Sequence, residues 1–424
     1  MSNLLPKMIE VRQSYPPSRQ LDFPALLEQQ FVTSGIMAKI APGMKIAVGV
    51  GSRGIGNLKS IVAATIATLK NAGAEPFIIP AMGSHGGATP EGQTKVLAEY
   101  GVTPESMGVP IMASMQVRKI GEALNGRDVV FSEAALAADG IVVINRVKPH
   151  TDFHGTLGSG LQKMLTIGFG KQVGAGNAHK AAAHLGHEAV IRAFSQVILG
   201  AVPVLCGVAI IDDPHHETAD VVVLRPEEFK AREDELVEQA RGLMPRLPLD
   251  EIDLLIVDQI GKEISGTGMD TNVIGRQIIG YSAALHPDPA RKPMVYRIVV
   301  RDLSRATNGN GIGIGLADFT TSRAVAALDK TYTYVNAVTS IGVLPAKIPI
   351  YFDSDKETIE AAITTLASDS PQSLRVVRIL NTLALDRILV SEACLSVLNT
   401  HPQVTITGQP QPMQFDVHGN LPQF

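Results

Sequence analysis

Short apolar runs alternate with longer segments of helical periodicity along the first half of the chain. The run at 44–50 is rich in β-branched residues and leads into glycines, and the segment 57–73 then repeats apolar residues at helical spacing until Gly73. Further apolar runs typical of buried strands occupy residues 75–81, 139–145 and 205–212. Between them, Thr89 and Pro90 have the arrangement of a helix N-cap followed by a first-turn proline. This alternation predicts a largely parallel sheet flanked by helices.

The second half repeats the alternation after a break in composition. A charged helix is predicted over 225–245, and it runs into the proline-rich segment MPRLPLDE before a new apolar strand at 252–260. Later strand-like and helical runs occupy residues 294–303, 347–355, 356–368 and 373–380. Proline and charge gather at domain boundaries. We therefore expect two α/β domains with mostly parallel sheets, residues 1–247 and 248–424, and an active site in the cleft between them.

The composition is that of a folded chain and argues against several classes of function. With 45% hydrophobic and 18% charged residues over 424 positions, the chain can bury ample apolar surface and is longer than one core usually organises. Its net charge of −4, with no basic cluster, argues against a nucleic-acid partner. No charge-free run reaches the length of a membrane span, so we expect no membrane association.

The N-terminal segment and the two cysteines indicate the cellular compartment. The first 23 residues lack a continuous apolar core followed by a small-residue cleavage site, so no secretory signal is expected. Cys206 and Cys394 both lie inside apolar runs, which suits reduced thiols in a core better than a disulfide. These features favour a cytoplasmic protein.

The first candidate for chemistry is the stretch GVGSRGIGN, which follows the strand at 44–50. It matches Gly-x-Gly-x-x-Gly between a strand and a helix, where backbone amides and a helix N-terminus hold phosphate. Arg53 within it adds a charged fork for a phosphate or carboxylate. A dinucleotide fold places an acidic residue after the next strand, but Ala81 and Met82 stand there. A phosphate-holding loop, a dinucleotide loop and a plain tight turn all stay open.

Two histidines directly follow predicted strands. His85 stands in MGSHGGATPEG, where a strand meets a helix, and His150 ends the segment GIVVINRVKPH. Ligand crevices in α/β sheets lie at such carboxyl ends of strands. The two imidazoles are therefore expected to converge from adjacent strand ends, and a purely structural histidine is the alternative at each position.

A third candidate region, 147–179, is rich in histidine, lysine and glycine. Lys163 stands there between glycines and an apolar stretch, where partial desolvation would lower the pKa of its amine and make it a better nucleophile. A surface lysine with its amine in water is the alternative. His179 is predicted to begin a helix that also carries His184 and His187. We interpret that last pair as solvated, because carboxylates and cysteines do not accompany it at ligand spacing.

Together these residues resemble a known family. The Arg53 loop, the histidine of GSH, the histidine of KPH, the glycine-bracketed Lys163 and the later His179 follow the order and approximate spacing of motifs in the nickel-pincer-nucleotide-dependent lactate racemase family. The resemblance extends over most of the first 210 residues and the beginning of the second domain. It lies in the set of motifs, since each motif alone is weak.

The resemblance implies a nickel cofactor, a pyridinium-3,5-bisthiocarboxylic acid mononucleotide that is joined to a lysine through a thioamide. By position, Lys163 would be the attachment lysine and His179 the nickel ligand. Gly51, Ser52 and Arg53 would bind the nucleotide. The resemblance also implies that enzymes of cofactor synthesis are partners of this chain.

The implied cofactor accounts for several features of the chain. Sulfur and carbon donors with one imidazole suit square-planar nickel, so a cage of cysteines is not needed. A mononucleotide has no adenosine, so a glycine loop without the distal acid is sufficient. Racemisation by reversible hydride transfer from C2 needs a base on each face of the substrate, and the resemblance gives these roles to His85 and His150.

The second domain departs from the family's pattern. Lactate racemases hold substrate with a lysine and a glutamine from a helix and place a tryptophan nearby, whereas the corresponding region here reads QIGKEISGTGMDTNVIGRQ and the chain has no tryptophan. The polar side chains of this region, Lys262, Asp270, Asn272 and Arg276, are candidates for binding substrate from a loop, with a solvated turn as the alternative. We expect the substrate to be a different 2-hydroxy acid or a polyhydroxylated acid.

Other functions stay open. A nicotinamide-dependent dehydrogenase would share the glycine loop but would need a ribose-binding acid and no Lys163. A non-catalytic carrier of the nickel nucleotide would keep Lys163 and His179 but need neither His85 nor His150. A zinc hydrolase would require a compact ligand triad, which the sequence does not offer. Assembly into a homo-oligomer is compatible with the sequence.

Overall fold

The computed structural model describes residues 5–51, 54–151, 155–276, 292–368 and 370–424, and the chain divides into two compact units. The central unit is Pro17–Met244, and the terminal unit joins Met1–Pro16 to Pro245–Phe424. Each unit has its own main sheet and its own apolar core. The protein is thus α/β with mostly parallel sheets, which confirms the fold class predicted from the sequence.

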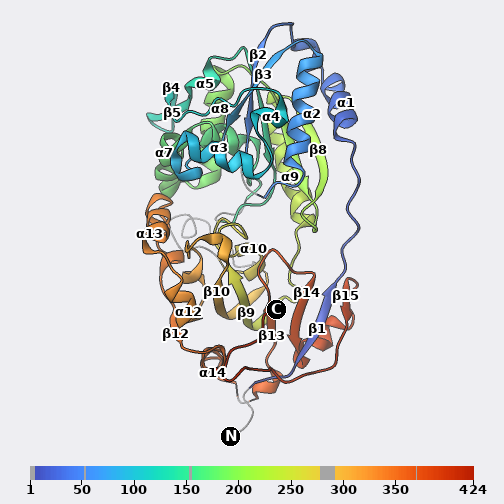
Figure 1. Ribbon diagram of the computed structural model, residues 1–424, viewed down its shortest axis with the longest axis vertical. Coiled ribbons are helices and arrows are strands. Elements are labelled where there is room, and N and C mark those ends of the chain that lie inside the picture. The colour runs from blue at the N-terminus through green and yellow to red at the C-terminus, as the bar shows by residue number, and fades with distance from the viewer. Residues whose placement is uncertain (1–4, 52–53, 152–154, 277–291, 369) are drawn as a thin grey trace. The chain divides into compact units, whose positions relative to one another are not determined.

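The N-terminal segment belongs to a different unit from the one that the sequence predicts. The strand β1 (Met8–Gln13) pairs antiparallel with β14 (Arg387–Ser391) and with β15 (Val404–Ile406). Figure 1 shows the blue β1 beside the red β14 and β15. The domain expected over 1–247 therefore lacks its first strand, which belongs to the other unit. The sequence does not predict this, because pairing between strands so far apart leaves no local pattern.

The described residues of the central unit form a five-stranded sheet in the order β3-β2-β6-β7-β8 and a hairpin of β4 and β5. The first four strands of the sheet are parallel, and β8 runs antiparallel to β7. The strands are β2 (Lys45–Val50), β3 (Glu75–Pro80), β4 (Val117–Ala123), β5 (Arg127–Ser132), β6 (Gly140–Arg146), β7 (Val204–Asp212) and β8 (Thr218–Leu224).

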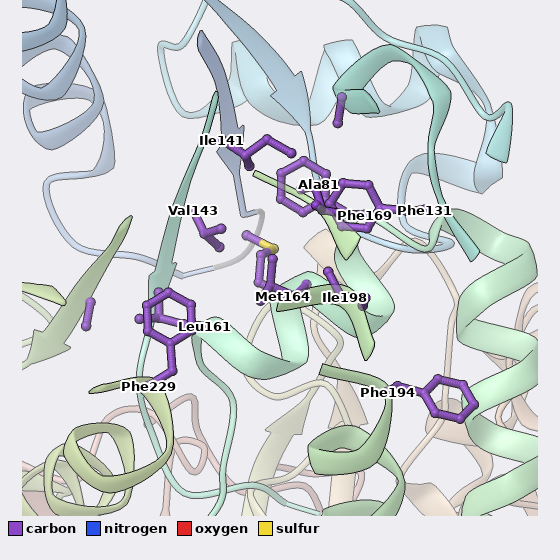
Figure 2. Packing of buried hydrophobic residues seen from close by; sticks show 14 of the residues in the cluster. Ala81, Phe131, Ile141, Val143, Leu161, Met164, Phe169, Phe194, Ile198 and Phe229 are labelled. Atoms are coloured by element: carbon purple, nitrogen blue, oxygen red, sulfur yellow. The ribbon is translucent and has the colours of Figure 1, made fainter. Parts of the chain in front are cut away.

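Apolar side chains cover both faces of this sheet, as is usual for parallel strands. On β2, Ala47 belongs to one core cluster, and Ile46 and Val48 belong to the other. Figure 2 shows the first cluster, where the ring of Phe169 stacks on that of Phe131 at a centroid distance of 4.8 Å. The helices are α1 (Phe23–Thr33), α2 (Leu58–Asn71), α3 (Pro90–Glu99), α4 (Pro104–Met107), α5 (Glu133–Leu136), α6 (Leu161–Lys163), α7 (Lys171–Leu185), α8 (His187–Ala201) and α9 (Phe229–Leu243).

The described residues of the terminal unit form an eight-stranded sheet in the order β12-β11-β10-β9-β13-β14-β1-β15. Strands from β12 to β13 are parallel, and the remaining pairs are antiparallel. The strands not yet located are β9 (Glu251–Ile260), β10 (Met294–Leu303), β11 (Phe319–Thr321), β12 (Ile350–Phe352) and β13 (Val376–Ile379). The helices are α10 (Thr271–Ile274), α12 (Ser322–Ala326), α13 (Lys330–Thr339), α14 (Asp355–Thr364) and α15 (Leu395–Leu398). None of the helices in the described part of either unit is long and apolar enough to cross a membrane.

Candidate active site

Three loops that carry candidate residues leave the carboxyl ends of parallel strands in the central sheet. The glycine-rich loop follows β2, the His85 loop follows β3, and the His150 loop follows β6. Because the strands are parallel, these loops share one edge of the sheet, where α/β proteins bind ligands. The prediction that His85 and His150 follow adjacent strands is wrong, since β2 lies between β3 and β6. Two inter-strand spacings, about 10 Å, separate the ends of the two strands.

The glycines after β2 are explained in part by packing. A Cβ on Gly49 would lie 2.1 Å from the ring of Phe169, and a Cβ on Gly51 would lie 2.6 Å from Oδ1 of Asn145. Glycine is therefore required where Asn145 and the segment 164–169 pack closely on the end of β2. The sequence alone leaves the role of these glycines open, and the structure shows that they allow at least this close packing.

A cation from β6 stands beside the same loop. Nη2 of Arg146 lies 3.5 Å from the place that a Cβ on Gly54 would occupy, and Nη1 donates to Oδ2 of Asp212 at 2.5 Å. Burial raises the pKa of the Asp212 carboxyl, with the neighbouring Arg146 acting against it. Ser52 and Arg53, which the sequence predicts to bind the nucleotide, lie outside the described residues. Arg146 is absent from the sequence-based prediction because it occurs there only as the end of a strand.

Lys163 is the last residue of α6, where the α-helix changes to a π-helix. α6 continues as a π-helix (Met164–Gly168), which is closed by the amide of Phe169 donating to the carbonyl of Met164 at 2.9 Å. Turns of π-helix are rare and occur frequently at functional sites. The changed winding therefore supports a functional role for the residues around Lys163.

A buried carboxyl fixes the start of this helix. Oε2 of Glu233 accepts hydrogen bonds from the backbone N and from Nε2 of Gln162, at 3.2 and 3.1 Å. Its Oε1 has no hydrogen-bond partner among the described residues. Burial raises the pKa of Glu233 to about 7, although these hydrogen bonds act to lower it. Gly160 is required beside it, because a Cβ there would lie 1.9 Å from Oε1.

Lys163 belongs to a cluster of four basic side chains. Its Nζ is in direct contact with Nε2 of His150. The ring centroid of His187 lies 6.4 Å from that of His150 and 5.6 Å from that of His179. The structure therefore brings together three of the residues predicted from the sequence, which are His150, Lys163 and His179. They come from the loop after β6, from α6 and from α7, and the start of α8 supplies His187.

Burial and mutual repulsion favour the neutral forms of these imidazoles. Burial is the main cause that holds the pKa of His150 well below its usual range, and the charge of Lys163 is the next. Burial followed by the charge of Lys163 lowers the pKa of His179 to about 4, and burial followed by the charge of His179 lowers that of His187 to about 3. A neutral imidazole offers a lone pair to a proton or a metal at neutral pH.

The interpretation of His187 as a solvated partner of His184 is wrong. Gly186, with φ of +80°, ends α7 and begins α8, so the two histidines stand on different helices. His184 is exposed, whereas His187 is half-buried within the cluster. His179 lies inside α7 and does not begin it. Gly186 is the sequence signal that marks the break between these helices.

The loop that carries His85 contacts the π-helix. The amide of Gly83 donates to the carbonyl of Gly168 at 3.2 Å, and the amide of His85 donates to that of Met82 at 3.1 Å. His85 itself is half-buried. The loop after β3 and the segment that follows Lys163 are thus held against each other.

The four residues predicted to bind substrate lie in the terminal unit, after β9. Asp270 caps α10 and accepts from the backbone N and from Nδ2 of Asn272, at 2.9 and 3.0 Å. Nζ of Lys262 donates to a backbone carbonyl within the same loop. Arg276 donates to both carboxylate oxygens of Asp318, at 3.1 and 2.6 Å. Asp318 thus occupies the guanidinium fork of Arg276, one of the predicted substrate-binding candidates.

Across the described ranges, no group of three or more His, Cys, Asp and Glu side chains is placed to hold a metal ion. Cys206 and Cys394 are both buried, as the sequence predicts, and they lie in the cores of different units. His179 is the residue predicted to bind nickel, and its neutral ring suits that role.

Comparisons with known proteins include two distant structural similarities. No protein-family model and no curated protein matches the chain. The crystal structure of a protein from Thermotoga maritima is 13% identical with a TM-score of 0.49, and the match covers 81% of this chain and 92% of that chain. The lactate racemase apoprotein from Thermoanaerobacterium thermosaccharolyticum is 16% identical with a TM-score of 0.42, over 69% of this chain and 74% of that chain. At such identities and TM-scores, a function has to be inferred from the residues of this chain.

Proposed function

We propose that the protein is a racemase or epimerase of 2-hydroxy acids that works with a nickel-pincer nucleotide. The proposal rests on the contact between Nζ of Lys163 and Nε2 of His150, within a cluster that includes His179 and His187. A lysine amine that meets a neutral imidazole can pass on its proton and act as a nucleophile. A nicotinamide-dependent dehydrogenase would have no use for such an amine.

The residues of the cluster fit this cofactor. Lys163 would carry the covalent link, and His179 would supply the imidazole ligand, because its lowered pKa leaves the ring neutral. The loop after β2, with Arg146 beside Gly54, would hold the phosphate of the nucleotide. Enzymes that synthesise the cofactor would then be partners of this chain.

Once bound, the cofactor would supply an acceptor for the C2 hydrogen of the substrate, taken as hydride. The protein itself would handle the hydroxyl proton, which one imidazole would remove while the other would return a proton to the same oxygen. His85 and His150 follow strands on either side of β2, so they would serve opposite faces of the substrate. The lowered pKa of His150 keeps its imidazole unprotonated at neutral pH, so its lone pair is free to accept the hydroxyl proton.

The proposed substrate is a 2-hydroxy acid or polyhydroxylated acid other than lactate. The chain has no tryptophan, and the guanidinium of Arg276 is engaged by Asp318. The residues that would hold lactate in the resembled family are thus replaced here by a differently built loop. A panel of acids, with both lactate enantiomers included, is therefore the appropriate set of probes.

A label on C2 tests the proposed chemistry. Protein carrying the cofactor is incubated in ordinary water with C2-deuterated acids from the panel, and the inverted product is analysed by NMR. Hydride transfer predicts that most deuterium stays at C2 of the product, because a hydride held by the cofactor does not exchange with water. Rapid loss of deuterium to solvent would instead indicate removal of C2 hydrogen as a proton.

The two histidines can be tested in the same assay. We expect His85→Asn and His150→Asn each to slow both directions of the reaction by about 10²-fold or more, since each imidazole is an acid in one direction and a base in the other. His184→Asn, at an exposed position of α7, is the matched control. Full activity in either of the first two variants would remove that histidine from the mechanism.

A further inference from the structure

Lys171, the first residue of α7, combines two costly features. Its side chain is completely buried, with 0% of its surface exposed, and its backbone has φ of +55°. A buried ammonium is unfavourable unless it is hydrogen-bonded, and a left-handed backbone costs further free energy for any residue except glycine. The proton-transfer and cofactor roles proposed above make no use of this residue. Its contacts suggest what it does.

Hydrogen bonds lead from Lys171 to the loop of His85. Nζ donates to the carbonyl of Pro80, the last residue of β3, and to Oε1 of Gln93 at 3.2 Å. Gln93 is also completely buried, and its Nε2 donates to the carbonyl of Gly83 at 2.9 Å and to that of His85 at 3.4 Å. Lys171 and Gln93 therefore hold three carbonyls along the segment 80–85, including that of His85.

The segment between β3 and α3 needs such support. Gly83, Gly86 and Gly87 all have positive φ, of 62°, 64° and 68°. Glycines lose much conformational freedom when they are fixed, so a loop with three of them is held in one shape only by specific contacts. The hydrogen bonds from Gln93 act on the carbonyls at both ends of the three-residue stretch 83–85 and so fix the backbone that presents the imidazole.

We propose that Lys171 and Gln93 are positioning residues that fix the backbone of His85 so that its imidazole meets the substrate. The catalytic consequence rests on the proposed function, in which His85 is an acid/base group. The support of the loop does not depend on it. The simplest alternative is that Gln93 serves only to satisfy the buried ammonium of Lys171.

One substitution separates these two roles. In Gln93→Glu the carboxylate still accepts from Nζ of Lys171, and it adds an opposite charge, so the ammonium stays satisfied. Both carboxylate oxygens are acceptors, however, so the bonds to the carbonyls of Gly83 and His85 are lost. A positioning role therefore predicts that the loop is released although the ammonium of Lys171 keeps its partner. Gln172→Glu, the same change at an exposed position of α7, is the control.

Amide hydrogen exchange on protein prepared without cofactor tests the loop directly. The probes are the amides of Ala81, Gly83 and His85, which donate to the carbonyls of Val50, Gly168 and Met82. We expect Gln93→Glu to speed their exchange by about 10-fold, which corresponds to the loss of one or two hydrogen bonds, and Gln172→Glu to leave it unchanged. Unchanged exchange in Gln93→Glu would overturn the proposal.

A second arm uses protein that carries the cofactor. Gln93→Glu should keep the same covalent mass increase and nickel content as the wild type, with kcat lowered by about 10²-fold and KM nearly unchanged, as a small displacement of a catalytic group produces. Wild-type kcat in this variant would remove the link to His85. If the wild type itself acquires no adduct, the proposed function fails, and the exchange experiment still decides whether Gln93 holds the loop.

Discussion

The central and terminal units each contain a cluster of ionisable side chains, and the two clusters are built in opposite ways. In the terminal unit, Asp258 accepts hydrogen bonds from Arg301 and Arg378, and Asp355 accepts from Arg301 and Arg323. Acids and bases alternate there. In the central unit, the side chains that meet are bases, with Nζ of Lys163 on the imidazole of His150.

This difference indicates that the terminal cluster supports the fold, whereas the central cluster is suited to a chemical role. In the terminal network each charge has partners of opposite sign, and backbone groups near the C-terminus join it, since Arg301 donates to the carbonyl of Leu421 at 2.7 Å. The bases of the central cluster instead lower the pKa of one another, which opposes their ionised forms. Strongly shifted pKa values at the edge of an α/β sheet are typical of functional sites.

The largest effect is expected in the terminal network. Asp355 is completely buried and accepts from Nε and Nη2 of Arg301 at 2.9 and 2.6 Å. Asp355→Asn removes the negative charge that Arg301 and Arg323 share, and the buried guanidinium of Arg301 is left with Asp258, which Arg378 also binds. The free energy of unfolding should therefore fall by about 3–5 kcal/mol. Urea denaturation measures this loss. Asp353→Asn, at an exposed position two residues away, should change stability by less than about 0.5 kcal/mol. Equal small losses in both variants would mean that the network does not support the fold.

Glu233, in the central unit, allows a second test of how a buried ionisable group affects stability, because burial is the main cause of its raised pKa. Its pKa of about 7 in the folded protein lies above the ordinary value of 4.5, so the folded state binds the proton more tightly than the unfolded state. This contribution to stability is complete below pH 4.5 and is lost as the pH rises to 7. The loss amounts to about 3 kcal/mol, and Glu233→Gln should not show it.

The measurement is urea denaturation of wild type and Glu233→Gln between pH 4 and pH 8. The variant should gain stability relative to the wild type as the pH rises, and most of the gain should fall between pH 4.5 and 7. Curves that stay parallel over this range would show that the carboxyl of Glu233 does not have a raised pKa in the folded protein.

The smallest effect concerns His187 in the central cluster. Its pKa of about 3 in the folded protein lies below the ordinary 6.5, so the unfolded state binds a proton that the folded state does not. Stability is therefore lost as the pH falls below 6.5. At pH 5 the loss from one such histidine is about 2 kcal/mol. His187→Asn should remove this loss, whereas His184→Asn, at an exposed position, should not. Equal acid sensitivity in both variants would place His187 in solvent.

The sequence predicts those elements whose signals are local. The strands β2, β3, β6, β7, β9 and β10 and the helices α2, α3, α9 and α14 appear where apolar periodicity and stop signals place them. The pairing of β1 with β14 and β15 could not be predicted, because it depends on contacts across almost the whole chain. The hairpin of β4 and β5 is also missed, since its residues are mixed in polarity and most of them are partly or fully exposed.

For the candidate active site, too, the sequence predicts only what local signals carry. Order along the chain is enough to single out His150, Lys163 and His179, and the structure brings them together. The place of His187 depends on the break at Gly186, which a spacing argument within one helix overlooks. Gly49 matches a phosphate-loop pattern, but its lack of a side chain is required by the ring of Phe169. Such close packing leaves no signature in a motif.

The proposed attachment of the cofactor to Lys163 is tested most directly by intact-mass analysis. The protein is produced together with the complete set of cofactor-synthesis enzymes, and mass under denaturing conditions and nickel content are measured for wild type, Lys163→Ala and Lys180→Ala, the last at an exposed position of α7. We predict a covalent mass increase with bound nickel in the wild type and in Lys180→Ala, and neither in Lys163→Ala. Wild-type protein with no added mass and no nickel, or an adduct that survives in Lys163→Ala, would contradict it.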